Sequence, residues 1–298
     1  MDREFKPKIN GLNNLGNTCF FNSVLQILYQ CTILNKIIYN NSITGNLIDQ
    51  YNLYLNSYNE HNSSFSPQYI INYVSNILGR NGYQQEDAEQ YLNFIIDTLI
   101  DELKLWTKKE GKGSTIIKGS ITLDILIDSL FTIKMNKEII CPDCKTISKS
   151  SDDINKLYLT LNDESNDLEN MIINYYTEKL DNENKYKCSS CKNHVEATIN
   201  RNIIKLPKYL IIALKRYTNN NDKINKRINI QESITFDSPN KTYNLRGFIY
   251  HSGNTGGGHY VYYGKKDNVW HEYNDSHVSI VNNIENIVGL GYIYLYVS

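Results

Sequence analysis

The chain has 298 residues, of which 41% are hydrophobic, 31 are basic and 32 are acidic, so its formal net charge is −1. This length and composition predict one large folded domain or two ordinary ones, and they exclude a chain that is disordered throughout. A charge near zero argues against bulk electrostatic attraction to nucleic acid or to an anionic membrane, which requires an excess of basic residues.

Residues 1–10 contain no apolar run, so they do not resemble a secretory signal, and we interpret them as an N-terminal leader. No stretch approaches the roughly 18 consecutive apolar residues of a membrane-spanning helix. We therefore expect an intracellular protein, cytoplasmic or nuclear, that is monomeric and binds neither membrane nor nucleic acid.

The first third of the chain has the apolar spacing of helices. Apolar residues at i, i+4 and i+7 predict a helix that begins at Thr18, with Asn17 or Thr18 as its cap. The same spacing predicts a second helix from Asp87 to about Leu105. The glycine-bearing stretch 108–119 that follows is typical of a flexible connection.

After Ser120 the pattern changes to short, often alternating segments bounded by turn residues, which predict strands. These segments are 121–123, 130–135, 156–161, 209–214, 245–251, 260–263, 269–273 and 291–297. Helices followed by strands favour an α+β fold over an alternating α/β fold.

Four of the six cysteines form two CxxC pairs, Cys141 with Cys144 and Cys188 with Cys191. Two such turns can complete a tetrahedral thiolate site, so we expect one structural zinc ion per chain. A redox role for a single CxxC is the alternative, but it leaves the second pair without a purpose. His194 could compete as a ligand, although a solvated surface histidine is commoner.

The other two cysteines, Cys19 and Cys31, lie in different surroundings. Cys31 follows an apolar helix, where a buried, inert thiol is the default. Cys19 lies at the predicted start of the helix, where free N–H groups and the helix dipole favour a thiolate. Cys19 is therefore a candidate nucleophile, while a purely structural cysteine is the commoner case.

A nucleophilic cysteine requires a base, and the base requires an orienting group. Among six histidines, His259 is preceded by three glycines, which leave room for a substrate strand. Asn274 and Asp275 follow fifteen residues later, and either side chain could accept a hydrogen bond from the imidazole Nδ1–H. A structural histidine remains the alternative.

Several motifs resemble those of the ubiquitin-specific proteases. Residues 11–26, GLNNLGNTCFFNSVLQ, resemble the Cys box of that family. Residues 247–275 resemble its His box, through GFIYHSG, GHY and WHEYND. Residues 206–217, which contain LP and LKRY, resemble the strand motif between the two boxes. The resemblance extends from about Gly11 to the end of the chain, with the motifs in the family's order.

The resemblance implies an α+β, papain-like cysteine protease core that forms a single domain over residues 11–298. Its parts would be a helical thumb at about 11–120, fingers with a zinc ribbon at 121–205, and a β-rich palm at 206–298. It also implies a thiol-dependent deubiquitinase that acts on ubiquitin or ubiquitinated proteins. Such an enzyme hydrolyses the isopeptide or peptide bond after the C-terminal glycine of ubiquitin, through a Cys-His-Asn triad and a thioester.

The resemblance assigns a role to each matched residue of the site. Cys19 is the nucleophile, His259 the base and Asn274 the orienting residue, with Asp275 as an accessory or alternative partner. Asn14 matches the position whose side chain helps to form the oxyanion hole, where an amide donor contributes roughly 10²–10³-fold to the rate.

Residues 85–92, QEDAEQYL, resemble the family's motif for the ubiquitin tail, which ends Leu-Arg-Gly-Gly. Asp87 matches the ligand of the tail arginine, and Tyr260, next to His259, is a further candidate for contact with the substrate. Gln90 departs from the family, which usually has Glu there, and a neutral hydrogen bond is roughly half as strong as a charge-assisted one. The acidic residues could also simply complement the dipole of the following helix.

Three other functions remain open at this point. A non-catalytic ubiquitin-binding module could share the fold, a protease for another ubiquitin-like modifier would fit Gln90, and a zinc ribbon could bind nucleic acid. Loops 217–226 and 252–258 are candidate gates of the tail channel. Target proteins and chain-linkage preference have no signature in the sequence.

Overall fold

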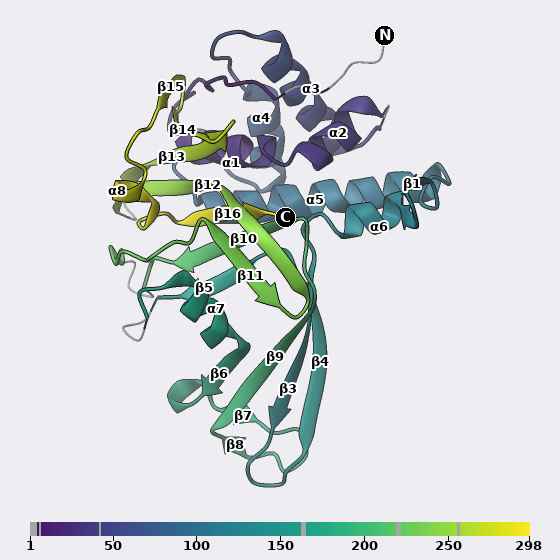
Figure 1. The fold of residues 1–298 in the computed structure, drawn as a ribbon, viewed down its shortest axis with the longest axis vertical. Coiled ribbons are helices and arrows are strands. Elements are labelled where there is room, and N and C mark those ends of the chain that lie inside the picture. The colour runs from purple at the N-terminus through teal and green to yellow at the C-terminus, as the bar shows by residue number, and fades with distance from the viewer. Residues whose placement is uncertain (1–4, 6, 42, 162–164, 219–221, 255–256) are drawn as a thin grey trace.

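The protein consists of a helical part, a central sheet and a narrow second sheet that extends away from it (Figure 1). The structure is a computed structural model, and it describes residues 5, 7–41, 43–161, 165–218, 222–254 and 257–298. The helical part and the central sheet pack against each other over a shared hydrophobic core. The expected combination of helices followed by strands is therefore confirmed.

In the described part of the chain, five helices precede the first strand, and the two that the sequence predicted are among them. The helices are α1 (Cys19–Tyr29), α2 (Thr32–Asn40), α3 (Asn46–Glu60), α4 (Gln68–Ile77), α5 (Ala88–Lys109), α6 (Leu123–Asp128), α7 (Leu168–Tyr176), α8 (Glu285–Val288) and a 3₁₀ turn (Asn182–Asn184). Every residue of α1 is buried, because this helix packs against the sheet strand β13 and against α5. No helix in the described ranges is long and apolar enough to cross a membrane.

The central sheet has the strand order β15-β14-β13-β12-β16-β10-β5, with β11 also paired to β12. Its strands are β5 (Leu157–Thr160), β10 (Tyr209–Lys215), β11 (Ser233–Asp237), β12 (Asn240–Asn254), β13 (Gly257–Lys266), β14 (Val269–Asn274), β15 (His277–Ile280) and β16 (Ile293–Val297). Alternate residues of a strand point to opposite faces. Tyr209 and Ile211 of β10 accordingly lie in the core shared with the helices, and Leu210 and Ile212 lie in a second core.

The second sheet has the strand order β4-β3-β9-β6, and a small hairpin, β7–β8, lies at its far end (Figure 1). Its strands are β3 (Ile133–Ile140), β4 (Ile147–Ile154), β6 (Thr177–Leu180) and β9 (Ala197–Lys205), and the hairpin is β7 (Tyr186–Lys187) with β8 (His194–Val195). β5 pairs in parallel with β10, so residues 157–160 belong to the central sheet although they fall in the range expected for the fingers.

Residues 108–123 differ from the prediction. The segment expected as a strand at 121–123 contains only the two-residue β2 (Ile121–Thr122), and Leu123 already begins α6. Thr122 ends the strand because its hydroxyl accepts a hydrogen bond from Ile125 N and so caps that helix. The expected flexible connection contains β1 (Ile116–Lys118), which pairs with β2.

Candidate active site

Cys19 is the first residue of α1, and only 2% of it is exposed. A tight turn precedes it, in which Gly16 has a φ of 103° and Asn17 a φ of 54°. The side-chain Oδ1 of Asn14 accepts hydrogen bonds from Gly16 N at 3.0 Å and Thr18 N at 3.1 Å. Thr18 occupies the cap position, but its side chain does not cap the helix, so the predicted cap is wrong in its chemistry. The Thr18 hydroxyl instead accepts a hydrogen bond from Leu15 N.

His259 lies on β13 beside Cys19, with which it shares a side-chain hydrogen bond. That bond is the main reason that the pKa of His259 is raised to about 9, against the lowering effect of burial. Asn274, at the end of β14, contributes in the same direction through its Oδ1, which lies 2.7 Å from His259 Nε2. The sequence-based expectation named Nδ1 for this bond and was wrong, because Asn274 meets the ring at Nε2.

Asp275 contacts two asparagines of the N-terminal segment, one through each carboxylate oxygen. Asn14 Nδ2 donates to one oxygen and Asn22 Nδ2 to the other, both at 2.8 Å. The main chain adds a third link, because Leu12 N donates to Asp275 O at 2.8 Å. Of the two neighbours that the sequence left open, Asn274 therefore contacts the histidine ring, and Asp275 fixes the segment before Cys19.

A cleft of about 540 Å³ contains all three predicted substrate-binding residues. It is lined by Gln85, Glu86, Asp87, Glu89, Gln90, Tyr158, Tyr217, His251, Asn254, Tyr260 and Tyr292. Tyr260 is the residue after His259, so the cleft reaches the strand that carries the histidine. Residues 219–221 and 255–256, within the two loops expected to act as gates, lie outside the described residues.

Asp87 lies both at the start of a helix and in the cleft, as the sequence suggested, and it also caps the helix, which the sequence analysis did not predict. Its Oδ1 accepts from Glu89 N at 2.8 Å and Gln90 N at 3.1 Å, which caps α5. Its Oδ2 accepts from the Tyr292 hydroxyl at 2.9 Å. Burial raises the pKa of Asp87, and these hydrogen bonds oppose the rise because they favour the carboxylate.

The acidic residues next to Asp87 differ in how closely they already pair with a basic residue, and so in how readily they could bind a ligand. Glu89 forms an ion pair of 2.5 Å with Lys156, and both side chains are 17% exposed. Glu86 lies 3.6 Å from Arg80. Gln90 is exposed at the rim of the cleft and carries no charge.

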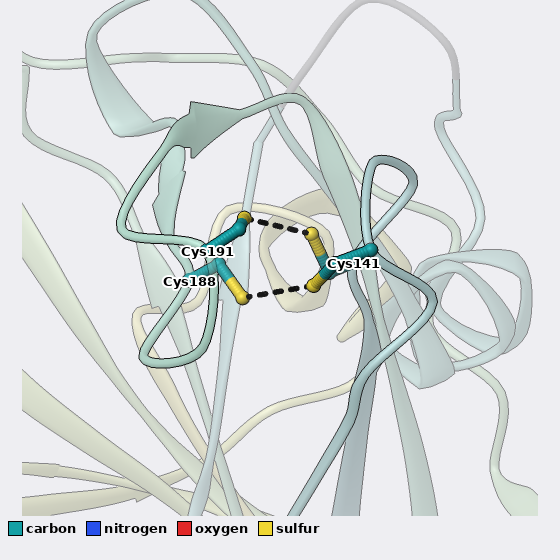
Figure 2. A group of neighbouring side chains, drawn as sticks. Cys141, Cys188 and Cys191 are labelled. Carbon is teal, nitrogen blue, oxygen red and sulfur yellow. Dashed lines mark hydrogen bonds between the residues drawn. The ribbon is translucent and has the colours of Figure 1, made fainter.

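The four CxxC cysteines converge at the far end of the second sheet (Figure 2). Their sulfur atoms all lie within 4.8 Å of one another, with 3.8 Å from Cys141 to Cys191 and 3.6 Å from Cys144 to Cys188. A tetrahedral zinc ion with Zn–S bonds of about 2.3 Å requires S–S separations of about 3.8 Å. A disulfide requires about 2.05 Å, so the spacing fits a metal and not a crosslink.

The two cysteine turns have the same main-chain geometry. Lys145 N donates to Cys141 O, and Lys192 N donates to Cys188 O, both at 3.0 Å. Both lysines have a positive φ, 59° and 66°, as a chain that turns sharply around a metal requires. Among the described residues, the group that could hold a metal does not include His194.

Burial keeps the side chains of Cys31 and His251 neutral. Cys31 is 1% exposed, and burial raises the pKa of its thiol well above the ordinary value, as expected of an inert cysteine. Burial lowers the pKa of His251 to about 4, helped by Lys223 and His259. Its Nδ1 contacts the Tyr217 hydroxyl, so it lines the cleft as a neutral ring.

Four residues of the site received no role from the sequence. Asn22, one turn after Cys19, is 3% exposed, and a buried amide on a mostly apolar helix was a usable signal, which Gln26 in the same helix shares. Tyr292 and His251 were hidden among many tyrosines and histidines. Gln85, whose side chain contacts Gly258 across 173 residues of sequence, had no signal that a local pattern could provide.

Comparison with known proteins agrees with this geometry. The family model described as "Ubiquitin carboxyl-terminal hydrolase" matches residues 10–296. Probable ubiquitin carboxyl-terminal hydrolase 16 of Schizosaccharomyces pombe is 29% identical over 92% of this chain and 63% of its own length. Ubiquitin carboxyl-terminal hydrolase 25 of Arabidopsis thaliana is 28% identical over 91% of this chain and 44% of its own. Human ubiquitin carboxyl-terminal hydrolase 2 is 24% identical over 99% of this chain and 56% of its own.

The chain thus spans between 44% and 63% of the lengths of these three relatives. The family match covers nearly all of it, including the segments that carry Cys19, His259 and Asn274. The mixed helix and sheet architecture agrees with the papain-like fold that this family implies. The chain belongs to the ubiquitin carboxyl-terminal hydrolases, a family of cysteine-type deubiquitinating peptidases.

Proposed function

We propose that this chain is a deubiquitinase that hydrolyses the isopeptide or peptide bond after the C-terminal glycine of ubiquitin. The observation that carries the proposal is the arrangement of Cys19, His259 and Asn274 beside an acidic cleft. A nucleophile, a base and an orienting group in hydrogen-bond contact are the constellation required for acyl transfer.

In the first step, Cys19 attacks the carbonyl carbon of the terminal glycine. His259 takes the thiol proton, or already pairs with the thiolate as an imidazolium, and its raised pKa favours the charged ring. Asn274 accepts from Nε2–H, which directs the Nδ1 edge of the ring toward the thiol and holds the ring in place. An amide in this position fixes the geometry without adding a second negative charge.

The oxyanion that forms in this step needs donors in place beforehand. Asn14 Nδ2 has two hydrogens, and its contact with Asp275 uses one of them. The second remains for the oxyanion, alongside the free main-chain N–H groups at the start of α1. Asp275 is thereby a positioning residue for Asn14.

The remaining steps return the enzyme to its starting state. His259 gives its proton to the leaving lysine amine, the C–N bond breaks and a thioester with Cys19 is left. Water then loses a proton to His259 and attacks the thioester carbonyl. The C–S bond breaks, free ubiquitin leaves with a terminal carboxylate, and the thiolate recovers the proton.

The cleft supplies the chemistry for an arginine-bearing tail. Asp87 carries a half-buried carboxylate, and the aromatic rings of Tyr217, Tyr260 and Tyr292 narrow the channel for glycine residues. A charge-assisted contact from an arginine would add to the hydrogen bonds that already hold Asp87. This supports a role for Asp87, Gln90 and Tyr260 in binding the substrate.

The second sheet provides the proposed fingers, with a zinc ion at their end. Zinc bound by Cys141, Cys144, Cys188 and Cys191 would tie the tip of β3–β4 to the β7–β8 hairpin. The ion would rigidify a surface that cradles ubiquitin, and it would take no part in the chemistry because it lies at the far end of the sheet (Figure 1).

Steady-state hydrolysis of ubiquitin carrying a C-terminal fluorophore tests the proposal. We expect turnover by the wild-type chain and a loss of at least ~10³-fold in Cys19→Ala, with melting temperatures compared to confirm folding. Tight ubiquitin binding without turnover by the wild-type chain would instead identify a non-catalytic binding module.

A second candidate, protease for another ubiquitin-like modifier, is favoured by one observation, the neutral and exposed Gln90 at the rim of the cleft. Side-by-side kcat/KM values for ubiquitin and other modifier fusions decide between the two. A preference for another modifier of more than about tenfold would exclude ubiquitin as the main substrate.

A further inference from the structure

Gln85, before α5, and Gly258, on β13, form a double contact. Gln85 Nε2 donates to Gly258 O at 2.6 Å, and Gly258 N donates to Gln85 Oε1 at 3.0 Å. One carboxamide therefore satisfies both polar groups of one residue. Gly258 immediately precedes His259, so the contact acts on the main chain that holds the imidazole.

The contact replaces a strand partner at this point of the sheet. On one side, β12 pairs with β13, with Ser252 opposite His259 and Gly253 opposite Gly258. On the other side, β14 meets β13 only from Tyr262 onward. In an antiparallel pair the N–H and C=O groups of successive residues point alternately toward and away from the partner strand. The two groups of Gly258 point away from β12, where the Gln85 carboxamide takes the place of a neighbouring peptide group.

Gly258 is confined on its other face as well. A Cβ atom there would lie 2.2 Å from His251 Nε2 and 2.3 Å from Ser252 O, so the histidine ring fills the space of a side chain. That ring is itself held by Tyr217 through Nδ1. Gly258 is thus held between the His251 ring on one side and the Gln85 carboxamide on the other.

The main chain on both sides of Gln85 is also held by hydrogen bonds. Gln85 lies two residues before Asp87, whose carboxylate caps α5 and accepts from Tyr292. The segment before it is held by a hydrogen bond from Gln84 N to Asn81 O at 3.0 Å. Gln85 therefore connects the rigid start of α5 to the strand that carries the histidine.

We infer that Gln85 is a positioning residue for the reaction: it fixes Gly258, and through it places His259 against Cys19. The inference rests on the proposed function for its effect on turnover, but the Cys19–His259 contact exists independently of any substrate. Because Gln85 is exposed, the contact stabilises the fold little, and its main effect is on geometry. A misplacement of about 1 Å at a reacting group costs up to about 10²-fold in rate.

Gln85→Ala removes both hydrogen bonds. The matched control is Gln84→Ala, the same change at the preceding, exposed residue, whose side chain makes no hydrogen bond among the described residues. Gln85→Asn keeps the carboxamide but draws it back by one methylene, so we expect it to behave like Gln85→Ala. All three variants should melt within about 3 °C of the wild type.

The first measurement needs no ubiquitin. The zinc-loaded full chain is alkylated with iodoacetamide between pH 5 and pH 10, and modification of Cys19 is followed by mass spectrometry. We expect alkylation of Gln85→Ala to be about tenfold slower than that of the wild type at pH 7, where reactivity depends on the nearby imidazolium. The rates should converge at pH 10, above the raised pKa of His259, where the imidazole is mostly neutral in both proteins. Profiles that coincide across the whole range would overturn the inference.

The second measurement is the separation of kcat from KM with the fluorogenic ubiquitin substrate. We expect Gln85→Ala to lower kcat about tenfold with KM within twofold, because the contact acts on the histidine and not on the tail. A higher KM with unchanged kcat would overturn the inference, since Gln85 would then bind the tail. If the wild type shows no turnover but its alkylation profile still depends on Gln85, the proposed function fails while the inference stands.

Discussion

Asp275→Asn tests how the segment before Cys19 is held, and it also removes a negative charge that helps to raise the pKa of His259. The carboxylate accepts from Asn14 Nδ2 and from Asn22 Nδ2, both at 2.8 Å. An amide has one acceptor oxygen, so in the variant an NH₂ group must face one of the two asparagines. The backbone is not perturbed, because φ at Asp275 is 52° and asparagine adopts this left-handed region readily.

The substitution should lower both the stability and the kcat of the protein, because the carboxylate accepts charge-assisted hydrogen bonds and holds Asn14 in place. A charge-assisted hydrogen bond is roughly twice as strong as a neutral one, and Asp275 is half-buried, so we expect a loss of about 1 kcal/mol in stability. For a chain of this length that corresponds to a melting temperature lower by about 2–4 °C. The catalytic effect is larger, because removing an oxyanion donor costs about 10²–10³-fold. A displaced Asn14 should cost about 10–100-fold in kcat.

The assay is steady-state hydrolysis of the fluorogenic ubiquitin substrate, with kcat and KM determined separately. Asp267→Asn is the matched control, since Asp267 also has a positive φ, 50°, but lies in the exposed turn between β13 and β14. We expect the control to match the wild type, and KM to be unchanged in both variants. Wild-type kcat in Asp275→Asn would refute the idea that Asp275 holds Asn14 for catalysis.

Three further predictions concern pH, metal and the tail. The pKa of His259 is raised from 6.5 to about 9, so its stabilising contribution is complete below pH 6.5 and is lost as the pH rises through about 9. We expect kcat/KM for an isopeptide-linked substrate to fall over the same upper range, and a flat profile to pH 10 would contradict this. Cys188→Ser should reduce zinc from about one ion per chain to almost none and lower the melting temperature by several degrees, whereas Ser189→Ala should do neither. Unchanged zinc in the first variant would exclude the site. Gln90→Glu should lower KM for ubiquitin about threefold, with Gln84→Glu as the control, and an unchanged KM would assign Gln90 no part in tail binding.

Local patterns accounted for the elements whose residues carry their own signal. The helix from Cys19 and the helix that Asp87 caps both follow from apolar spacing, and both are present. The paired CxxC turns predicted a four-cysteine cluster for a similar reason, because each turn closes within a few residues. Most of the predicted strand segments after Ser120 overlap observed strands, but β4, β9, β11 and β15 were not predicted, and neither were the pairings between strands.

The features that the sequence missed depend on contacts between distant residues. The link from Asp275 to Asn14 spans 261 residues, and the link from Gln85 to Gly258 spans 173. No propensity or periodicity records such a pairing, since each residue alone looks like a polar loop residue. Asn274 contacts Nε2 of His259 rather than Nδ1 because of the way β13 and β14 lie relative to each other. The sequence pattern could not predict which of the two ring nitrogens would meet Asn274.

The most direct test of the central claim is the reaction of the full chain with ubiquitin that carries an electrophile at its C-terminus. One probe molecule should add per chain, peptide mapping should place it on Cys19, and Cys19→Ala should remain unmodified while Cys31→Ala reacts normally. No adduct on the wild type, or an undiminished adduct on Cys19→Ala, would contradict the account.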